Sequence, residues 1–231
     1  MKYILIWFLL LIAGFAQKPQ PENTTVPTVT FDVFWEQATP QQYTISVQAT
    51  GETRYLSRNP TKPPDENGVQ GDDYETHFTM SAGTRDKIFS LTEQASYFNG
   101  DFDYKKHNIA NTGKKTLTYT DPARRFLTTY NWSENPAVDQ LTRTFQGIST
   151  VIEHGRKIRF LHRFDKLGLE SELKAMEEQF AGHYLTELQA ISPTLEDVAN
   201  DPAILHIARE RAKRLLAQCA KEEANSVKSV R

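Results

Sequence analysis

Residues 115–152 read KTLTYTDPARRFLTTYNWSENPAVDQLTRTFQGISTVI, and the spacing of the apolar residues changes within this stretch. In 115–119 and 126–130 the larger apolar residues alternate with polar ones, which is the period of a strand with one buried face. From Asn135 onward they recur every three to four positions, as in an amphipathic helix. Asn135 is a suitable helix cap, and Pro136 suits the first helical position. The stretch therefore predicts that the chain changes from strands to helices near residue 134.

Toward the N-terminus the same alternation continues. The predicted strands there are 29–35, 43–47, 53–57 and 74–80. Gly51 lies where a tight hairpin turn needs a residue that tolerates positive φ, so the first three strands are expected to form an antiparallel meander. A polar loop, 58–73, precedes the fourth strand, and a helix capped by Thr84 follows it. Residues 29–133 are thus predicted to be an antiparallel sheet with one packed helix.

Toward the C-terminus the pattern is helical. The predicted helices are a first one from Asn135 with a bend near Gly155, a second over 169–191, and a last one from Asp201 to Cys219, with a short turn or helix at 194–200. Residues 134–220 form the expected helical domain, an antiparallel bundle, and 221–231 a flexible tail. The fold class is therefore predicted to be α+β.

The charges of the three long helices alternate in sign. The stretch 153–166 has a net charge of +3, the stretch 169–191 of −4 and the stretch 202–219 of +3. Opposite charges on neighbouring helices favour one register and disfavour others. We therefore expect these charges to pair within the protein; an anionic partner for the basic stretches is the alternative.

The first sixteen residues have the layout of a secretory signal peptide. Lys2 precedes an apolar run over 3–13, and Gly14 and Ala16 provide small residues at positions −3 and −1 of a cleavage site. The run is shorter than the roughly 20 residues of a spanning helix. We expect cleavage after Ala16, a linker over 17–28, and a periplasmic or extracellular protein with no transmembrane segment.

Composition excludes several classes of function. The chain of 231 residues has 27 basic and 29 acidic residues, so no strongly basic domain indicates nucleic-acid binding. Cys219 is the only cysteine, which excludes an intramolecular disulfide and a cysteine-rich zinc site. Cys219 falls on an apolar helix face and is interpreted as a small buried hydrophobe; an intermolecular disulfide is the alternative. Phosphate-binding glycine motifs and a G-x-S-x-G nucleophile motif are absent from the sequence.

No residues stand out as a catalytic, cofactor-binding or metal site. His183 with Glu187 and His206 with Glu210 are spaced i, i+4, but two ligands alone do not make a stable metal site. We therefore predict no catalytic residue, no cofactor and no metal. If the protein is a hydrolase whose residues meet only in three dimensions, His77 and the loop 58–73 are the candidates.

Residues 29–130 resemble small domains of unknown function found in secreted or periplasmic bacterial proteins. The matching stretches are 29–31, 40–45, 51–55 and 97–98. Such domains often carry a cysteine pair before the second strand, where this chain has residues 35–40 and no cysteine. The resemblance implies no activity, and it does not include the helical part.

The sequence has clear strand and helix patterns but no group of residues typical of a catalytic or cofactor site. This combination favours a non-enzymatic binding protein. We expect an exported protein that contacts another protein or a component of the bacterial envelope. Two alternatives remain: an exported hydrolase with a site assembled in space, and a structural dimer formed through the long helix.

Overall fold

The computed structural model describes residues 26–60, 73–106 and 108–229, with side chains as far as Lys221. The predicted signal peptide, most of the linker and most of the 58–73 loop lie outside the described residues. The fold is α+β, as predicted, with a six-stranded antiparallel sheet and packed C-terminal helices.

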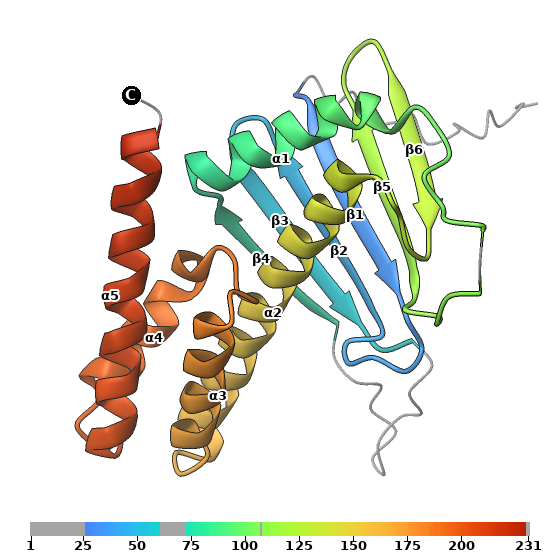
Figure 1. Cartoon of the computed structure of the whole chain (residues 1–231). Helices are drawn as coiled ribbons and strands as arrows, with labels where there is room; N and C mark the ends of the chain where they lie inside the picture. Colours follow the sequence, from blue (N-terminus) through green and yellow to red (C-terminus); the bar gives the residue numbers. More distant parts are fainter. Residues whose placement is uncertain (1–25, 61–72, 107, 230–231) are drawn as a thin grey trace, which may run out of the picture.

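The sheet contains all six predicted strands. They are β1 (Thr28–Phe34), β2 (Gln42–Gln48), β3 (Glu52–Arg58), β4 (Tyr74–Thr79), β5 (Lys114–Thr120) and β6 (Arg125–Tyr130). Their spatial order is β4-β3-β2-β1-β5-β6 (Figure 1). The predicted meander is confirmed, and β5 then joins the free side of β1, where Leu117 is the partner of Phe31.

One face of the sheet is buried and the other is polar. Phe31, Ile45 and Leu117 are fully buried on the inner face, which α1 and α2 cover (Figure 1). On the outer face the Thr44 hydroxyl donates to Asp32 across 2.6 Å. The period-two pattern of the sequence therefore corresponds directly to the two faces.

Helix α1 (Ala82–Gln94) begins earlier than predicted. Ser81 is its N-cap, and the Ser81 hydroxyl accepts a hydrogen bond from the backbone N–H of Thr84 at 3.3 Å. The prediction that Thr84 is the cap was wrong, because Thr84 already lies in the first turn. A short 3-10 turn, η1 (Ser96–Phe98), follows the helix and buries Phe98.

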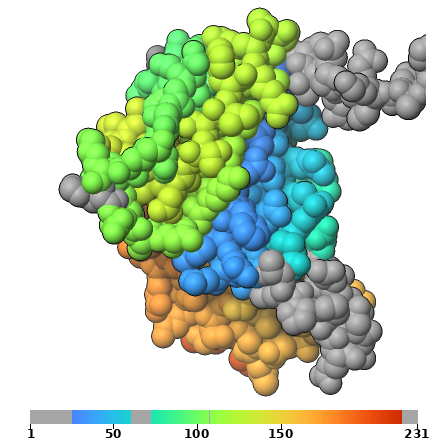
Figure 2. Space-filling view, turned by 90° about the vertical axis from the view of Figure 1, so that its right-hand side faces the viewer, coloured from blue at the N-terminus to red at the C-terminus, as the bar shows by residue number. Residues whose placement is uncertain are grey.

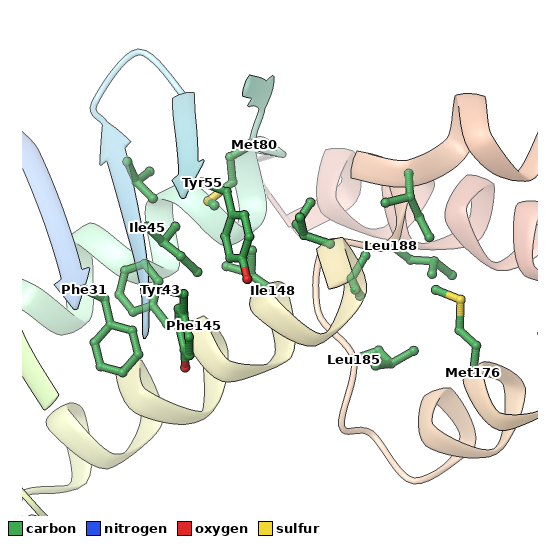
Figure 3. Packing of buried hydrophobic residues seen from close by; sticks show 14 of the residues in the cluster. Phe31, Tyr43, Ile45, Tyr55, Met80, Phe145, Ile148, Met176, Leu185 and Leu188 are labelled. Atoms are coloured by element: carbon green, nitrogen blue, oxygen red, sulfur yellow. The ribbon is translucent and has the colours of Figure 1, made fainter. Parts of the chain in front are cut away.

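Helix α2 (Pro136–Phe164) lies between the sheet and the helices that follow it in the chain (Figure 1). Asn135 caps it as predicted, since its side chain accepts from the N–H groups of Ala137 and Val138. The helix continues without a break through Gly155. Figure 3 shows core side chains of the sheet on one side of α2 and those of the later helical segments on the other. The buried residues therefore form one continuous cluster across both parts of the chain.

Helix α3 (Leu169–Ala181) ends ten residues before the predicted end at Ile191. His183 and Glu187 have positive φ angles of 60° and 70°, which no α-helix accommodates. Tyr184, which fits the predicted apolar stripe, is 72% exposed. The chain leaves the helix at Gly182 to pass close to α2, and then forms a second 3-10 turn, η2 (Leu188–Ile191).

The last two helices are α4 (Ser192–Asn200) and α5 (His206–Ser229). Pro193 lies in the first turn of α4, where the fixed φ of proline suits a helix start. The prediction that the last helix begins at Asp201 was wrong, because the Asp201 side chain caps a turn by accepting from the N–H of Ala203 at 2.8 Å. The backbone of α5 continues beyond Lys221, where a tail was expected.

The alternating helix charges pair as predicted. Glu172 of α3 lies 2.5 Å from Lys157 of α2, and Glu177 of α3 contacts Arg211 and Arg214 of α5. Cys219 is buried, which confirms its interpretation as a packing residue. Within the described part of the chain, no helix combines the length and apolar character needed to cross a membrane.

Candidate binding groove

A groove of about 750 Å³ lies beside the middle of α2. The connection between β1 and β2, the residue that follows β3, and α3 complete its walls. In Figure 2 the blue end of the sheet lies next to the orange helical part. The lining residues are Ala38, Thr39, Pro40, Tyr43, Asn59, Gln146, Ser149, Thr150, Glu153, His154, Arg156, Lys157, Phe160 and Glu172. Because these residues come from both parts of the chain, the groove forms only when the sheet and helices pack together.

The β1–β2 connection is fixed by its own hydrogen bonds. The backbone N–H of Trp35 donates to the carbonyl of Gln41 at 2.8 Å. The Gln41 side chain donates to the carbonyl of Glu36 at 2.9 Å, and its backbone N–H donates to the Asn59 side chain at 3.2 Å. This wall is therefore defined by the sequence around Gln41, which is only 5% exposed.

Glu153 is the centre of a hydrogen-bond network at the base of the groove. One of its oxygens accepts from the Tyr55 hydroxyl at 2.8 Å and from the Ser57 hydroxyl at 2.7 Å. The Tyr55 oxygen also lies 3.1 Å from that of Ser149. Burial, together with the charge of Glu153, raises the pKa of Tyr55 above its usual value. At neutral pH the Tyr55 hydroxyl therefore keeps its proton. It donates a hydrogen bond to Glu153 and holds that carboxylate in place.

His154 and Lys157 both contact Glu172 across the gap between α2 and α3. His154 Nδ1 lies 2.6 Å from Glu172 Oε1, and Lys157 Nζ lies 2.5 Å from Glu172 Oε2. Burial alone would raise the pKa of Glu172, but the hydrogen bonds from His154 and Lys157 outweigh it and lower the pKa. Glu172 is therefore a charged carboxylate at neutral pH.

The charges that line the groove balance. The carboxylates of Glu153 and Glu172 face the cations of Arg156 and Lys157, and Arg156 lies 3.8 Å from Glu153. The remaining surface contains apolar groups, including the 59% exposed ring of Phe160. Such a surface suits a ligand with an apolar portion and no net charge.

His154 is not placed as the base of a nucleophile. In a catalytic triad a carboxylate orients one nitrogen of the histidine, and the other nitrogen contacts the nucleophile. Glu172 occupies the first position beside His154, but Nε2 lies 3.2 Å from Oε1 of Gln179 instead of a hydroxyl. The contacts of His154 with Glu172 and Gln179 thus link α2 to α3.

The residues considered for a hydrolase or a metal site do not converge. His77 is on the outer face of β4, where its Nε2 lies 3.0 Å from Glu75 Oε1, and it does not line the groove. His183 and Glu187 do not share a helix, since α3 ends before them. His206 and Glu210 do share α5, at 3.9 Å. Among the described residues, no three potential metal ligands cluster.

Sequence reasoning missed the groove because its residues are spread over a strand, two helices and two connecting segments. A local signal nevertheless existed on α2, where Ser149, Glu153 and Lys157 are spaced four residues apart. Residues with this spacing lie on one helix face. That polar row runs beside the apolar seam of α2.

No protein-family model matches the chain, and neither the curated proteins nor the solved structures contain a match to it.

Proposed function

We propose that this chain is an exported, non-enzymatic binding protein whose ligand site is the groove beside α2. The observation that carries the proposal is the shape and chemistry of the groove. Its volume of about 750 Å³ is within the usual range of ligand sites, roughly 300–1,000 Å³. Its walls are held by the Gln41 hydrogen bonds and by the Glu153 network, so the site is formed before a ligand arrives.

The ligand of this proposal is an uncharged or zwitterionic molecule with one apolar portion. A net anion would meet Glu153 and Glu172, and a net cation would meet Arg156 and Lys157. A zwitterion places each of its charges near the opposite one. Tyr43 and Phe160 provide the apolar contacts. A short peptide, or a segment of an envelope protein, has this chemistry.

Binding is favoured over hydrolysis by the surroundings of His154. The nitrogen that would accept a proton from a nucleophile faces Gln179. Export is supported by the sequence of residues 1–16, and the resemblance of residues 29–130 to secreted bacterial domains agrees with it.

The test measures ligand-induced stabilisation in the chain that begins at Gln17. The probes are short hydrophobic peptides in zwitterionic form, together with acidic and basic counterparts. Zwitterionic peptides are expected to raise the melting temperature most, because a ligand that binds only the folded state stabilises it. The variant Gln146→Trp fills the groove and should abolish the shift, whereas Gln140→Trp, on an exposed part of the same helix, should retain it.

Two outcomes would contradict the proposal. An equal shift in the Gln146→Trp variant would place the ligand elsewhere. Cleavage of the peptides by the purified chain would instead support the hydrolase alternative.

A further inference from the structure

The last turns of α2 and the turn that follows carry an exposed apolar cluster. Phe160 is 59% exposed, Phe164 is 64% exposed and Leu167 is 75% exposed. The two phenylalanines are one helical turn apart, and their ring centroids lie 5.0 Å from each other. We call these three residues the α2 tip.

The α2 tip is separate from the side of the helix that packs. Ile158 and Leu161 are buried, so the packed side of α2 is already covered in this region. Successive helical residues are about 100° apart, which places Phe160 and Phe164 on a different face. The final turns of α2 thus have a second apolar face, and contiguous exposed apolar residues of this kind mark interaction surfaces.

A second exposed segment lies at the same end of the molecule. Asp201 lies 2.9 Å from His162 and 2.8 Å from Lys166, and these contacts hold the 201–205 turn against the end of α2. Leu205, in that turn, is 49% exposed. Figure 1 shows the end of α2 and the start of α5 at the lower end of the molecule.

Basic side chains surround the α2 tip. Residues 156–167 contain five lysines and arginines but only one acidic residue, Asp165. The Arg163 guanidinium lies 5.0 Å from the centroid of the Phe164 ring, and no carboxylate pairs with Arg163 among the described residues. Among the described residues, carboxylates pair with Arg156, Lys157 and Lys166, which leaves Arg159 and Arg163 as the basic side chains without a carboxylate partner.

We propose that the α2 tip docks on the surface of an anionic phospholipid membrane. Phe164 and Leu167 enter the boundary between headgroups and acyl chains, and Arg163 contacts lipid phosphates. Exposed aromatic and aliphatic side chains with a basic surround are the features of interfacial membrane binding. A second copy of the chain fits less well, because a symmetric contact would bring two basic surfaces together. Phe160 also lines the groove, but Phe164 and Leu167 do not, so the proposal does not depend on the groove ligand.

The test is co-flotation with lipid vesicles. The chain that begins at Gln17 is used, so that the apolar stretch 3–13 cannot contribute to binding. Vesicles of phosphatidylcholine mixed with phosphatidylglycerol are expected to bind the protein, and vesicles of phosphatidylcholine alone to bind it much less. High salt should weaken binding because it screens the charges.

Variants assign the binding to the α2 tip. The double variant Phe164→Ser and Leu167→Ser is expected to lower the partition coefficient between vesicles and water roughly tenfold or more. The variant lacks the two apolar side chains whose transfer from water into the membrane favours binding. Leu127→Ser removes a leucine that is 54% exposed on β6, and it should leave binding unchanged. Arg163→Glu should reduce binding to the anionic vesicles. All of these side chains are exposed, and circular dichroism verifies that each variant folds.

Three results would overturn the proposal. One is failure to float with the anionic vesicles. Another is equal loss of binding in Leu127→Ser. The third is a dimer in solution that the double variant dissociates while neither protein binds vesicles, which would assign the α2 tip to a second copy of the chain.

Discussion

At the scale of single residues, Glu187 is the least expected feature of the molecule. It is 3% exposed, and it accepts hydrogen bonds from the backbone N–H and the hydroxyl of Ser81, the cap of α1. Gln189 donates to the same carboxylate. No lysine or arginine pairs with Glu187 within the described part of the chain. Burial raises the pKa of Glu187, and the hydrogen bonds from Ser81 and its neighbours oppose the shift only in part.

A raised pKa makes the folded state bind a proton more tightly than the unfolded state. The stabilisation that this provides is complete below the unfolded pKa of about 4.5 and is lost as the pH rises through the folded pKa. We therefore predict that Glu187→Gln is more stable than the natural chain at pH 7, because the amide is uncharged and keeps an acceptor for Ser81. The difference should shrink toward pH 4. Urea unfolding at several pH values measures it.

Glu187→Ala is the informative comparison for this prediction. Alanine leaves the Ser81 N–H without an acceptor, so this variant should lose about 1–3 kcal/mol of stability at both pH values. If Glu187→Gln were the less stable variant at pH 7, the carboxylate charge would have to stabilise the fold, contrary to the direction of its pKa shift.

Glu187 could not be identified from the sequence. It continues the apparent helical period of 169–191, in which a glutamate between Tyr184 and Leu188 fits a solvated face. The actual cause of its burial is a backbone turn with positive φ, and no local residue type indicates that turn except Gly182. Single-residue roles of this kind depend on a distant partner, here the start of α1.

At the scale of elements, two glycines of α2 allow other segments to pack closely. A Cβ on Gly147 would lie 2.7 Å from the Thr186 hydroxyl oxygen and 3.0 Å from the Tyr184 carbonyl oxygen. A Cβ on Gly155 would lie 2.5 Å from Cγ2 of Ile191. The segment between α3 and α4 thus crosses α2 at both glycines. The sequence predicts a bend at Gly155, and a glycine in an apolar seam has the same signature whether it bends a helix or admits a neighbour.

We predict that Gly155→Ala destabilises the protein by about 1–3 kcal/mol, as overpacked core substitutions do. Alanine favours a helix over glycine by about 1 kcal/mol, so the steric effect has to exceed this gain. Chemical denaturation measures the loss.

The variant Ile191→Ala tests whether the loss comes from this contact. In a double-mutant cycle, Gly155→Ala should cost clearly less in the Ile191→Ala background, because the methyl group then occupies vacated space. Equal costs in the two backgrounds would show that the contact with Ile191 is not the cause.

At the scale of the whole molecule, the sequence predicted the fold well and the groove not at all. Alternation in strands such as 29–35 and the Asn135–Pro136 helix start are local patterns, and local patterns decide fold class. The groove instead needs Asn59, Glu153 and Glu172 to lie around one hollow, and their separation along the chain carries no period. The position of β5 beside β1 likewise depends on how the chain crosses from β4 to β5. The alternation within each strand does not determine that path.

The predicted leader gives a test of processing. When the full chain is expressed in a bacterium with a general secretion system, we predict that the mature protein begins at Gln17, because Gly14 and Ala16 suit the signal peptidase. N-terminal sequencing and intact mass measure this. Ala16→Phe should block cleavage at that bond, whereas a product that retains Met1 in the natural chain would contradict the leader assignment.

The alternating charges make a final prediction about how the helices are held together. Glu177 of α3 accepts from Arg211 and Arg214, and its side chain is only 22% exposed. Burial would raise the pKa of Glu177, but the hydrogen bonds from Arg214 and Arg211 lower it. Its pairing therefore stabilises the fold above the unfolded pKa and is lost as the pH falls through the folded pKa. We predict that Glu177→Gln loses about 1 kcal/mol of stability at neutral pH, which is the usual net contribution of an intramolecular hydrogen bond.

The adjacent Glu178 is the matched control for that prediction. It lies 3.9 Å from Lys174 on the same helix, and its side chain is 69% exposed. An exposed pair of this kind contributes about 0–0.5 kcal/mol, so Glu178→Gln should scarcely change the urea midpoint. High salt should also reduce the difference in stability between the Glu177→Gln and Glu178→Gln variants. Salt screens the contact of Glu177 with Arg214, which is partly open to solvent. If both substitutions had the same effect, the pairing between α3 and α5 would add nothing beyond surface charge, and alternation would not guide the packing of the helices.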